Sequence, residues 1–232
     1  MVAGKDKKKI TVALAGNPNS GKTTLFNNLT GAKQHVGNWP GVTVEKKEGS
    51  CSFKGYDIKV VDLPGVYSLT AYSLDEVIAR NFVVDENPDV VVDIVDASNL
   101  ERNLYLTVQF LEMGVKLVVA LNMMDVAQSR DYQIDVKQLC RLMGVPVVPM
   151  VANRNQGTAE LLETIIGVVQ GKISVKGLQI QYSREVEEEI TRLETMISDE
   201  PGFQEYSSRW LAIKLLEEDR EIIRKFEELG VG

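Results

Sequence analysis

The chain has 232 residues, of which 44% are hydrophobic and 25% charged, a composition typical of a globular protein with one sizeable core. Its formal net charge of −7 resides in residues 177–232, which carry 7 Lys and Arg against 14 Asp and Glu. This distribution argues against a nucleic-acid binder, and two cysteines with one histidine offer no metal-ligand cluster. No apolar run reaches the ~18 residues of a membrane span, and the basic start lacks the apolar region of a signal peptide. We therefore expect a soluble chain in a reducing cytoplasm.

Residues 16–23, GNPNSGKT, fit the phosphate-binding pattern G-x-x-x-x-G-K-[ST] at every required position. An apolar, β-branched run at 10–15 predicts a strand before the pattern, and the spacing of apolar residues at 24–29 predicts a helix after it. Backbone N–H groups of such a loop bind an anion. Lys22 is expected to reach the β- and γ-phosphates, and Thr23 to ligate Mg²⁺. The alternative is a chance match in a glycine-containing turn.

A loop is predicted at 30–41, where glycine, asparagine and proline break any period. Strands follow at 42–53 and 56–62, and their short connection predicts an antiparallel hairpin. The second strand ends in Asp62-Leu63-Pro64-Gly65. In P-loop nucleotidases such an aspartate holds Mg²⁺, and the glycine N–H contacts the γ-phosphate. By itself the pattern also fits an ordinary strand-ending turn.

The alternation of strands and helices continues with a helix at 73–87, a strand at 90–96, a helix at 100–113 and a strand at 116–121. The last of these strands runs into Asn122-Met123-Met124-Asp125, an N-x-x-D pattern. An aspartate here can accept from both N1–H and the exocyclic amino group of guanine, whereas adenine leaves polar groups unpaired. The alternative is a capping turn.

A helix at 136–143, a strand at 145–151 and a helix at 158–169 complete a mostly parallel α/β sheet of six to seven strands flanked by helices. The acidic remainder predicts two further helices. The first, with Ser183 as its cap, continues to Ile197, and the second covers 208–229. One interpretation of this small helical part is a stabilising cap, and its charge run predicts a solvated face.

With three motifs in order, the chain resembles the translation-factor-like small GTPases. The loops at 16–27, 36–45 and 62–69 are most similar to the cytosolic N-terminal region of the ferrous-iron transport protein B (FeoB) family, and the segment GNWPGVT at 37–43 discriminates it from other GTPases. The resemblance implies a P-loop GTPase fold at 1–172, followed at 173–232 by a small all-helical spacer domain similar to a guanine-nucleotide dissociation inhibitor (GDI-like).

From the motifs and the resemblance together, we expect the chain to bind GTP or GDP and Mg²⁺ through the following residues. The resemblance implies that Thr43 is the switch I threonine that closes on Mg²⁺ and the γ-phosphate; the alternative is a β-branched residue that starts a strand. Residues expected to bind nucleotide are Asn17, Asn19, Ser20, Gly21, Lys22, Thr23, Thr24, Gly41, Val42, Thr43, Asp62, Gly65, Asn122, Met123, Asp125, Val151, Ala152 and Asn153. The expected catalytic residues are Lys22, Thr43, Asn19 and Gly65, and the expected Mg²⁺ ligands are Thr23, Thr43 and Asp62.

Two departures from other GTPases lead to further expectations. Val66 stands where many signalling GTPases carry a water-orienting glutamine, and no arginine lies at 34–43. A K⁺ ion could supply the missing positive charge, held by Asn19 and the backbone carbonyls of Gly37 and Trp39, as the resemblance also implies; alternatively, Asn19 only hydrogen-bonds its own loop. The base-binding loop, residues 151–154, lacks the usual serine and lysine, which predicts a looser pocket and fast GDP release.

These observations predict a GTPase with slow intrinsic, K⁺-stimulated hydrolysis, whose switch loops regulate Fe²⁺ uptake. The resemblance implies the transmembrane iron-permeation part of the same protein as partner, small cytosolic Feo proteins as further partners, and a place at the cytoplasmic face of the inner membrane. No nucleic-acid partner is expected, and the sequence does not decide an oligomeric state. The alternative is a soluble assembly or ribosome-associated GTPase that acts as a nucleotide-gated binding module.

Overall fold

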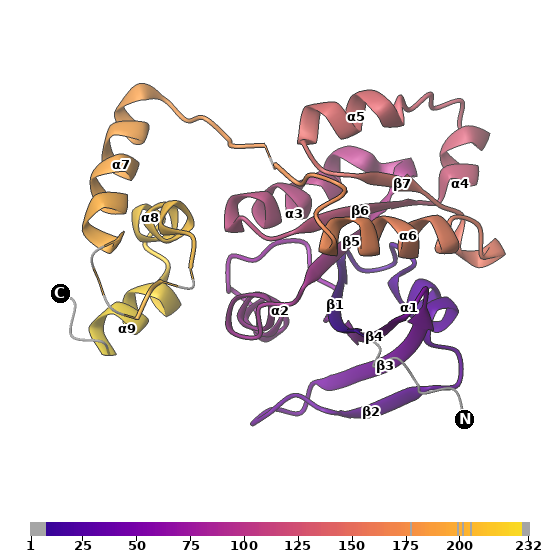
Figure 1. Cartoon of the computed structure of the whole chain (residues 1–232). Helices are drawn as coiled ribbons and strands as arrows, with labels where there is room; N and C mark the ends of the chain where they lie inside the picture. The colour runs from indigo at the N-terminus through magenta and orange to yellow at the C-terminus, as the bar shows by residue number, and fades with distance from the viewer. Residues whose placement is uncertain (1–7, 177, 199, 201, 205, 229–232) are drawn as a thin grey trace.

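The computed structural model describes residues 8–228 apart from 177, 199, 201 and 205, and it contains one seven-stranded sheet (Figure 1). The strands are β1 (Lys8–Gly16), β2 (Gln34–Asn38), β3 (Glu45–Phe53), β4 (Tyr56–Asp62), β5 (Val90–Asp96), β6 (Leu117–Asn122) and β7 (Val147–Pro149), in the order β2-β3-β4-β1-β5-β6-β7. The five strands from β4 to β7 in this order run parallel, and β3 pairs antiparallel with both β2 and β4. The predicted mostly parallel sheet is thus confirmed, with the antiparallel hairpin at its edge.

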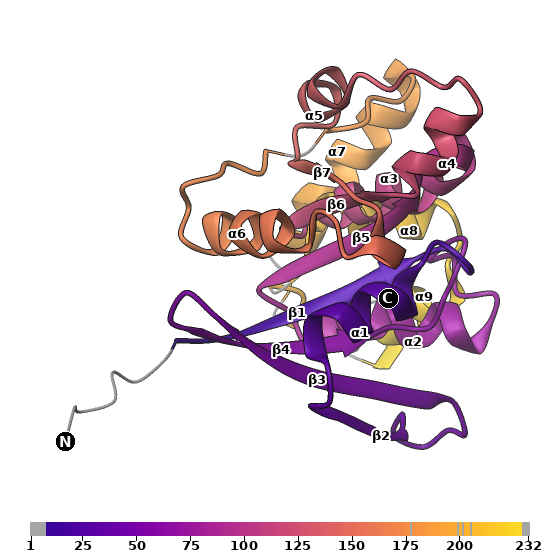
Figure 2. The same ribbon diagram turned by 90° about the vertical axis from the view of Figure 1, so that its right-hand side faces the viewer.

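Helices cover both faces of the sheet, as the nearly continuous burial of β5 and β6 requires (Figure 2). They are α1 (Lys22–Thr30), α2 (Leu74–Asp85), α3 (Leu100–Met113), α4 (Met124–Ser129), α5 (Val136–Met143) and α6 (Thr158–Val169). Apolar side chains of α1 and α6 pack on one face, and those of α2, α3 and α5 pack on the other. The short helix α4 begins within the N-x-x-D pattern, at Met124, and is an addition to the predicted elements.

The segment predicted as a loop at 30–41 contains β2, so that prediction is wrong for residues 34–38. β2 pairs with β3 from Gln34 opposite Gly49 to Asn38 opposite Glu45. The turn that joins them is closed by two hydrogen bonds: Trp39 N–H donates to Val44 O, and Val42 N–H donates to Trp39 O. The following strand therefore begins at 45 rather than at the predicted 42. Backbone hydrogen bonds to a distant partner strand outweigh the turn-forming residues of this segment.

The C-terminal part consists of α7 (Arg184–Ser198), α8 (Ser208–Leu216) and α9 (Arg220–Glu228). The single helix predicted at 208–229 is wrong, because the chain leaves the helix at Glu218 (φ 55°) and restarts at Asp219, whose Oδ1 accepts from the N–H groups of Glu221 and Ile222. Leu229 lies outside the described residues. The domain boundary at 172/173 stays a prediction.

The helical part packs against the helices on the α2 and α3 face of the sheet, and Figure 1 shows it beside α2 and α3. Trp210 and Leu211 of α8 belong to the same buried apolar cluster as Phe110 of α3. Arg80 of α2 reaches into this part and forms a buried ion pair with Asp219 at 2.6 Å. Among the described residues, no helix combines the length and the apolar character needed to cross a bilayer.

Candidate nucleotide-binding site

The P-loop, residues 16–23, connects β1 to α1 through a backbone that two glycines permit. Gly16 has a φ of 148° and Gly21 a φ of 92°, in the region that L side chains rarely adopt. A Cβ atom on Gly21 would lie 2.2 Å from Nδ2 of Asn122, so the close approach of the next motif also requires glycine here. The loop ends at the N-terminus of α1, where free N–H groups and the helix dipole favour an anion.

Two buried side chains of the P-loop retain unused hydrogen-bonding capacity. The Asn17 amide and the Ser20 hydroxyl have no hydrogen-bond partner among the described residues, although these residues are only 3% and 1% exposed. Buried polar groups are normally paired, so this loop fits a polar ligand. Asn19, Thr23 and Thr24 are exposed at the same loop and the first turn of α1.

Lys22 lies against the end of β4, where the D-x-x-G pattern begins. Its Nζ is 2.5 Å from Oδ1 of Asp62, and both side chains are mostly buried. The parallel pairing of β1 with β4 sets Asp62 opposite Leu14, which brings both motifs to the carboxyl edge of the sheet. A Cβ atom on Gly65 would lie 3.4 Å from Cα of Pro18, so the glycine also approaches the P-loop closely. The predicted phosphate-binding lysine, aspartate and glycine are therefore neighbours.

Asn122 joins the P-loop to the predicted base-binding loop. Its Nδ2 donates to Ser20 O at 2.8 Å, and its Oδ1 accepts from Ala152 N–H at 2.9 Å. Asn28 of α1 donates to Ala152 O at 2.7 Å, so both backbone groups of Ala152 are held. Asn122 is 3% exposed, and all three hydrogen bonds are short. The predicted steadying role of the asparagine in N-x-x-D fits this geometry.

Asp125 lies at the start of α4, half-buried and beside a cation. Its Oδ1 accepts from Val126 N–H at 3.0 Å, and its Oδ2 is 3.8 Å from Nη2 of Arg154. Met123 is the residue that precedes α4 and adopts a φ of 60°. Val151, in the base-binding loop, is buried. Asn153 and Arg154 are exposed in a 3₁₀ turn, Ala152–Arg154. An arginine of the base-binding loop thus stands beside the carboxylate.

The switch I residues are not assembled at this edge. Gly37 lies inside β2 opposite Lys46, and the carbonyl of Trp39 accepts from Val42 N–H. Gly41 and Thr43 are exposed on the β2–β3 turn, and Val42 is half-buried. Figures 1 and 2 both show the tip of this hairpin well apart from α1. Switch I here forms a hairpin that packs against α2.

The donor groups fit Mg²⁺ better than K⁺ in this conformation. The Thr23 hydroxyl, in the first turn of α1, and the Asp62 carboxylate, at the end of β4, lie at one edge of the sheet and are hard oxygen donors of the kind that Mg²⁺ prefers. The K⁺ set is incomplete, because the Gly37 and Trp39 carbonyls belong to the hairpin while Asn19 lies in the P-loop. Groups of three or more His, Cys, Asp or Glu that could hold a metal ion are absent from the described part of the chain.

Sequence reasoning missed the residues that support the site from a distance. In the sequence, Asn28 is one polar residue of a predicted helix, and only the folded chain brings its amide to Ala152 O. Gln109 of α3 accepts from Leu69 N–H at 2.7 Å, across 40 residues. Neither belongs to a motif, so no local signal could have identified it.

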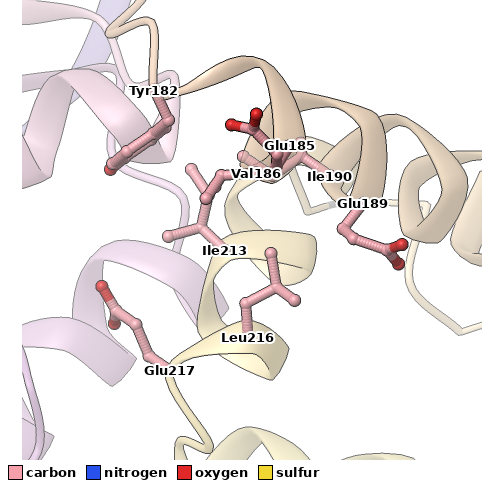
Figure 3. Close-up of a pocket in the computed structure, with 8 residues that line it drawn as sticks. All are labelled: Tyr182, Glu185, Val186, Glu189, Ile190, Ile213, Leu216 and Glu217. Carbon is pink, nitrogen blue, oxygen red and sulfur yellow. The ribbon is translucent and has the colours of Figure 1, made fainter.

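A separate cavity of about 500 Å³ lies in the helical part, between α7 and α8 (Figure 3). Val186, Ile190, Ile213 and Leu216 form its apolar wall, and carboxylates, among them Glu185, stand around it. Apolar and acidic groups do not match a triphosphate. The nucleotide motifs therefore define a different site from this cavity.

A P-loop, a strand-ending D-x-x-G and an N-x-x-D loop on one edge of a mostly parallel sheet define the P-loop GTPase class of nucleotide-binding domains. The family model of ferrous iron transport protein B matches residues 10–165, and that of the FeoB cytosolic helical domain matches 182–230. The chain belongs to the FeoB family, of which it holds the G domain and the cytosolic helical domain.

Individual relatives agree with this assignment. The chain is 46% identical over 216 residues to the Fe(2+) transporter FeoB of Salmonella typhimurium, an alignment that covers 91% of this chain and 27% of that protein. Among solved structures, the cytosolic domain of the T. maritima FeoB iron transporter in a GDP form matches with a TM-score of 0.90 and 40% identity, covering 98% of this chain and 88% of that one. Its GMPPNP form matches with a TM-score of 0.89 and 41% identity, covering 96% and 87%. The chain thus spans about a quarter of the length of the curated relatives that it matches.

Proposed function

We propose that this chain is the GTP-binding and GTP-hydrolysing cytosolic part of a membrane ferrous-iron transporter, at the cytoplasmic face of the inner membrane. The observation that carries the nucleotide part is the pair of hydrogen bonds by which Asn122 joins the P-loop to Ala152. These bonds fix the position of the phosphate-binding loop relative to the base-binding loop. The iron transporter follows from the family and from relatives that are Fe(2+) transporters.

Each group has a role in this proposal that follows from its chemistry. Lys22 neutralises the β- and γ-phosphates in place of Asp62, its present partner. The N–H of Gly65 binds the γ-phosphate, and the Asp125 carboxylate accepts from guanine. The backbone of residues 151–153 contacts the guanine oxygen. Thr23, Asp62 and, once switch I closes, Thr43 would hold Mg²⁺, which when bound neutralises charge on the phosphate oxygens.

Guanine specificity is tested with Asp125→Asn. The variant should bind GTP at least tenfold more weakly, because the amide presents a donor where guanine needs an acceptor. Its affinity for xanthosine triphosphate should increase. Competition with a fluorescent nucleotide measures both affinities. Asp131→Asn, at an exposed aspartate just beyond α4, is the matched control and should bind like the parent. GTP affinity equal to that of the parent in Asp125→Asn would contradict the guanine assignment.

Potassium dependence is proposed for the hydrolysis step. No arginine lies at 34–43 and the Val66 side chain is apolar and buried, so the developing negative charge between the phosphates still needs a cation. GTP hydrolysis should be several-fold faster in KCl than in NaCl at equal ionic strength, and Asn19→Ala should abolish the difference while GTP binding stays. Asn87→Ala is the control, because Asn87 also has a positive φ but lies outside the nucleotide motifs. Equal rates in the two salts for the unmodified chain would rule K⁺ out.

The proposed partners are the transmembrane iron-permeation part of the same protein and small cytosolic Feo proteins. Most of the length of the curated relatives lies outside this chain. The Arg80–Asp219 ion pair connects α2, which follows the D-x-x-G loop, to the helical part. We propose this helical part as the spacer through which the nucleotide state is passed on.

A further inference from the structure

The segment after Gly65, residues 66–72, is held by α3 through two separate contacts. Leu69 N–H donates to Oε1 of Gln109 at 2.7 Å, and both residues are nearly fully buried. About two turns closer to the N-terminus of α3, Cζ of Arg102 lies 4.2 Å from the ring centroid of Tyr67. A guanidinium at this distance over a tyrosine ring forms a cation–π contact. Side chains from one helix thus fix this segment at two points.

The same segment is fixed on its other side by α2 and by the core. Val66 and Leu69 are buried in the apolar cluster beneath the sheet. Ser68 Oγ donates to Oε1 of Glu76 at 2.6 Å, and Tyr72 N–H donates to its Oε2 at 2.9 Å. Gln109 therefore satisfies a buried backbone donor of this segment, Leu69 N–H. Without an acceptor, a buried N–H would bear the full cost of desolvation.

We infer that Gln109 and Arg102 are positioning residues for GTP hydrolysis, because they fix the loop that presents Gly65 N–H to the γ-phosphate. This inference rests on the proposed function. The side chain directly after Gly65 cannot orient a water, since Val66 is apolar and buried. Backbone groups of this loop take that role, and their accuracy depends on how firmly the loop is held. A preorganised loop costs no rearrangement at the moment of reaction.

The test compares variants that remove or retain the acceptor at position 109. Gln109→Leu should lower kcat for GTP about tenfold or more, while KM for GTP and affinity for GDP change less than twofold. Gln109→Glu keeps a carbonyl acceptor in either protonation state and should restore kcat. Hydrogen exchange of the Leu69 amide gives a readout independent of activity, and it should accelerate in Gln109→Leu only.

Arg102 is exposed, so its substitution leaves the core intact. The inference can therefore still be tested if Gln109→Leu does not fold. Arg102→Ala should lower kcat several-fold and Arg102→Lys should recover most of it, because the lysine ammonium can also form a cation–π contact with the tyrosine ring. Glu101→Ala, at the exposed neighbour on α3, is the control. Parental kcat and parental Leu69 exchange in Gln109→Leu, or parental kcat in Arg102→Ala, would overturn the inference. Absence of hydrolysis by the unmodified chain would instead overturn the proposed function, and the inference with it.

Discussion

Gly21 and Asn122 occupy adjoining space, so the P-loop and the base-binding loop share one tightly fitted contact. The 2.2 Å between a Cβ at position 21 and Nδ2 of Asn122 leaves no room for even a methyl group. The same amide holds Ser20 O. A change at one small residue therefore affects phosphate and base recognition together.

Gly21→Ala should weaken nucleotide binding at least tenfold, because the methyl group displaces Asn122 from both loops. The control is Gly55→Ala, since Gly55 has a similar φ of 84° but nothing within 4 Å of its Cβ position. Both variants share the strain of alanine at positive φ, of the order of 1 kcal/mol. Nucleotide affinity and thermal unfolding separate the two effects. If Gly55→Ala and Gly21→Ala bound nucleotide equally, the contact with Asn122 would have no role.

Asp93 is a buried carboxyl group in the middle of β5, and its burial raises its pKa to about 7 even though Thr107 donates to it at 2.5 Å. Between about pH 4 and pH 7 the folded chain binds more protons at this group than the unfolded chain does. Stability therefore falls as the pH rises through this range, and the ionised carboxylate destabilises the fold above it.

Asp93→Asn retains a carbonyl acceptor for Thr107 and does not ionise. The variant should be more stable than the parent at pH 8, by roughly 1–4 kcal/mol at about 1.4 kcal/mol per pKa unit. This gain should shrink as the pH falls toward 4. Denaturant unfolding at several pH values measures it, with Asp131→Asn as the exposed control. A gain independent of pH would contradict the assignment to this carboxyl group.

At the scale of elements, the β2–β3 hairpin is the part whose conformation depends most on tertiary contacts. Trp39 is 7% exposed, packs edge-on against Phe82 of α2 with ring centroids 5.5 Å apart, and has Lys46 Nζ 4.8 Å over its ring. Its Nε1 has no hydrogen-bond partner among the described residues. This anchor keeps Thr43 exposed on the turn. For Thr43 to reach Mg²⁺ as proposed, the tip has to leave α2.

Trp39 emission should therefore shift to longer wavelength when the non-hydrolysable analogue GMPPNP binds, and stay unchanged with GDP, because the indole becomes solvated as switch I closes. The second tryptophan, Trp210, is removed as Trp210→Phe. Adding Thr43→Ala should abolish the shift and slow hydrolysis tenfold or more, with GDP affinity retained. Identical spectra with both nucleotides would contradict a hairpin that moves.

At the scale of the whole molecule, the Arg80–Asp219 ion pair joins the nucleotide-binding part to the helical part. The two side chains are 2% and 4% exposed, and Asp219 also caps α9 through Oδ1. Its other oxygen, Oδ2, accepts from Arg80 Nη1. One carboxylate thus fixes the start of a helix and the contact with α2.

Arg80→Met should destabilise the fold by about 3–5 kcal/mol, because Asp219 would be left as an unpaired buried charge. The double variant Arg80→Met with Asp219→Asn should recover part of the loss, since it removes that charge. Arg192→Ala, which disrupts an exposed pair with Glu189, should change stability by less than about 0.5 kcal/mol. Thermal unfolding measures all three, and a double variant no more stable than Arg80→Met would contradict the unpaired-charge explanation.

Features with local causes were predictable from the sequence. The helices at 136–143 and 158–169 have the predicted bounds, because apolar spacing and the glycines beside them are enough to define them. The P-loop, the D-x-x-G turn and the N-x-x-D loop each follow a strand, and parallel strands place their carboxyl ends on one edge. The identities of Lys22, Asp62 and Asn122 therefore predicted their neighbourhood as well.

Only the tertiary structure decided where partners distant in sequence meet. β2 exists because β3 supplies hydrogen bonds, and the break between α8 and α9 coincides with the residue that pairs with Arg80. Gln109 reaches Leu69 across 40 residues. In each case the structure depends on hydrogen bonds or an ion pair between segments that are far apart in the sequence and independent in the unfolded chain. No local sequence pattern predicts such a contact. The sequence by itself determined the motifs and the sheet edge on which they lie, and the folded chain decided the state of switch I and the contacts that hold residues 66–72.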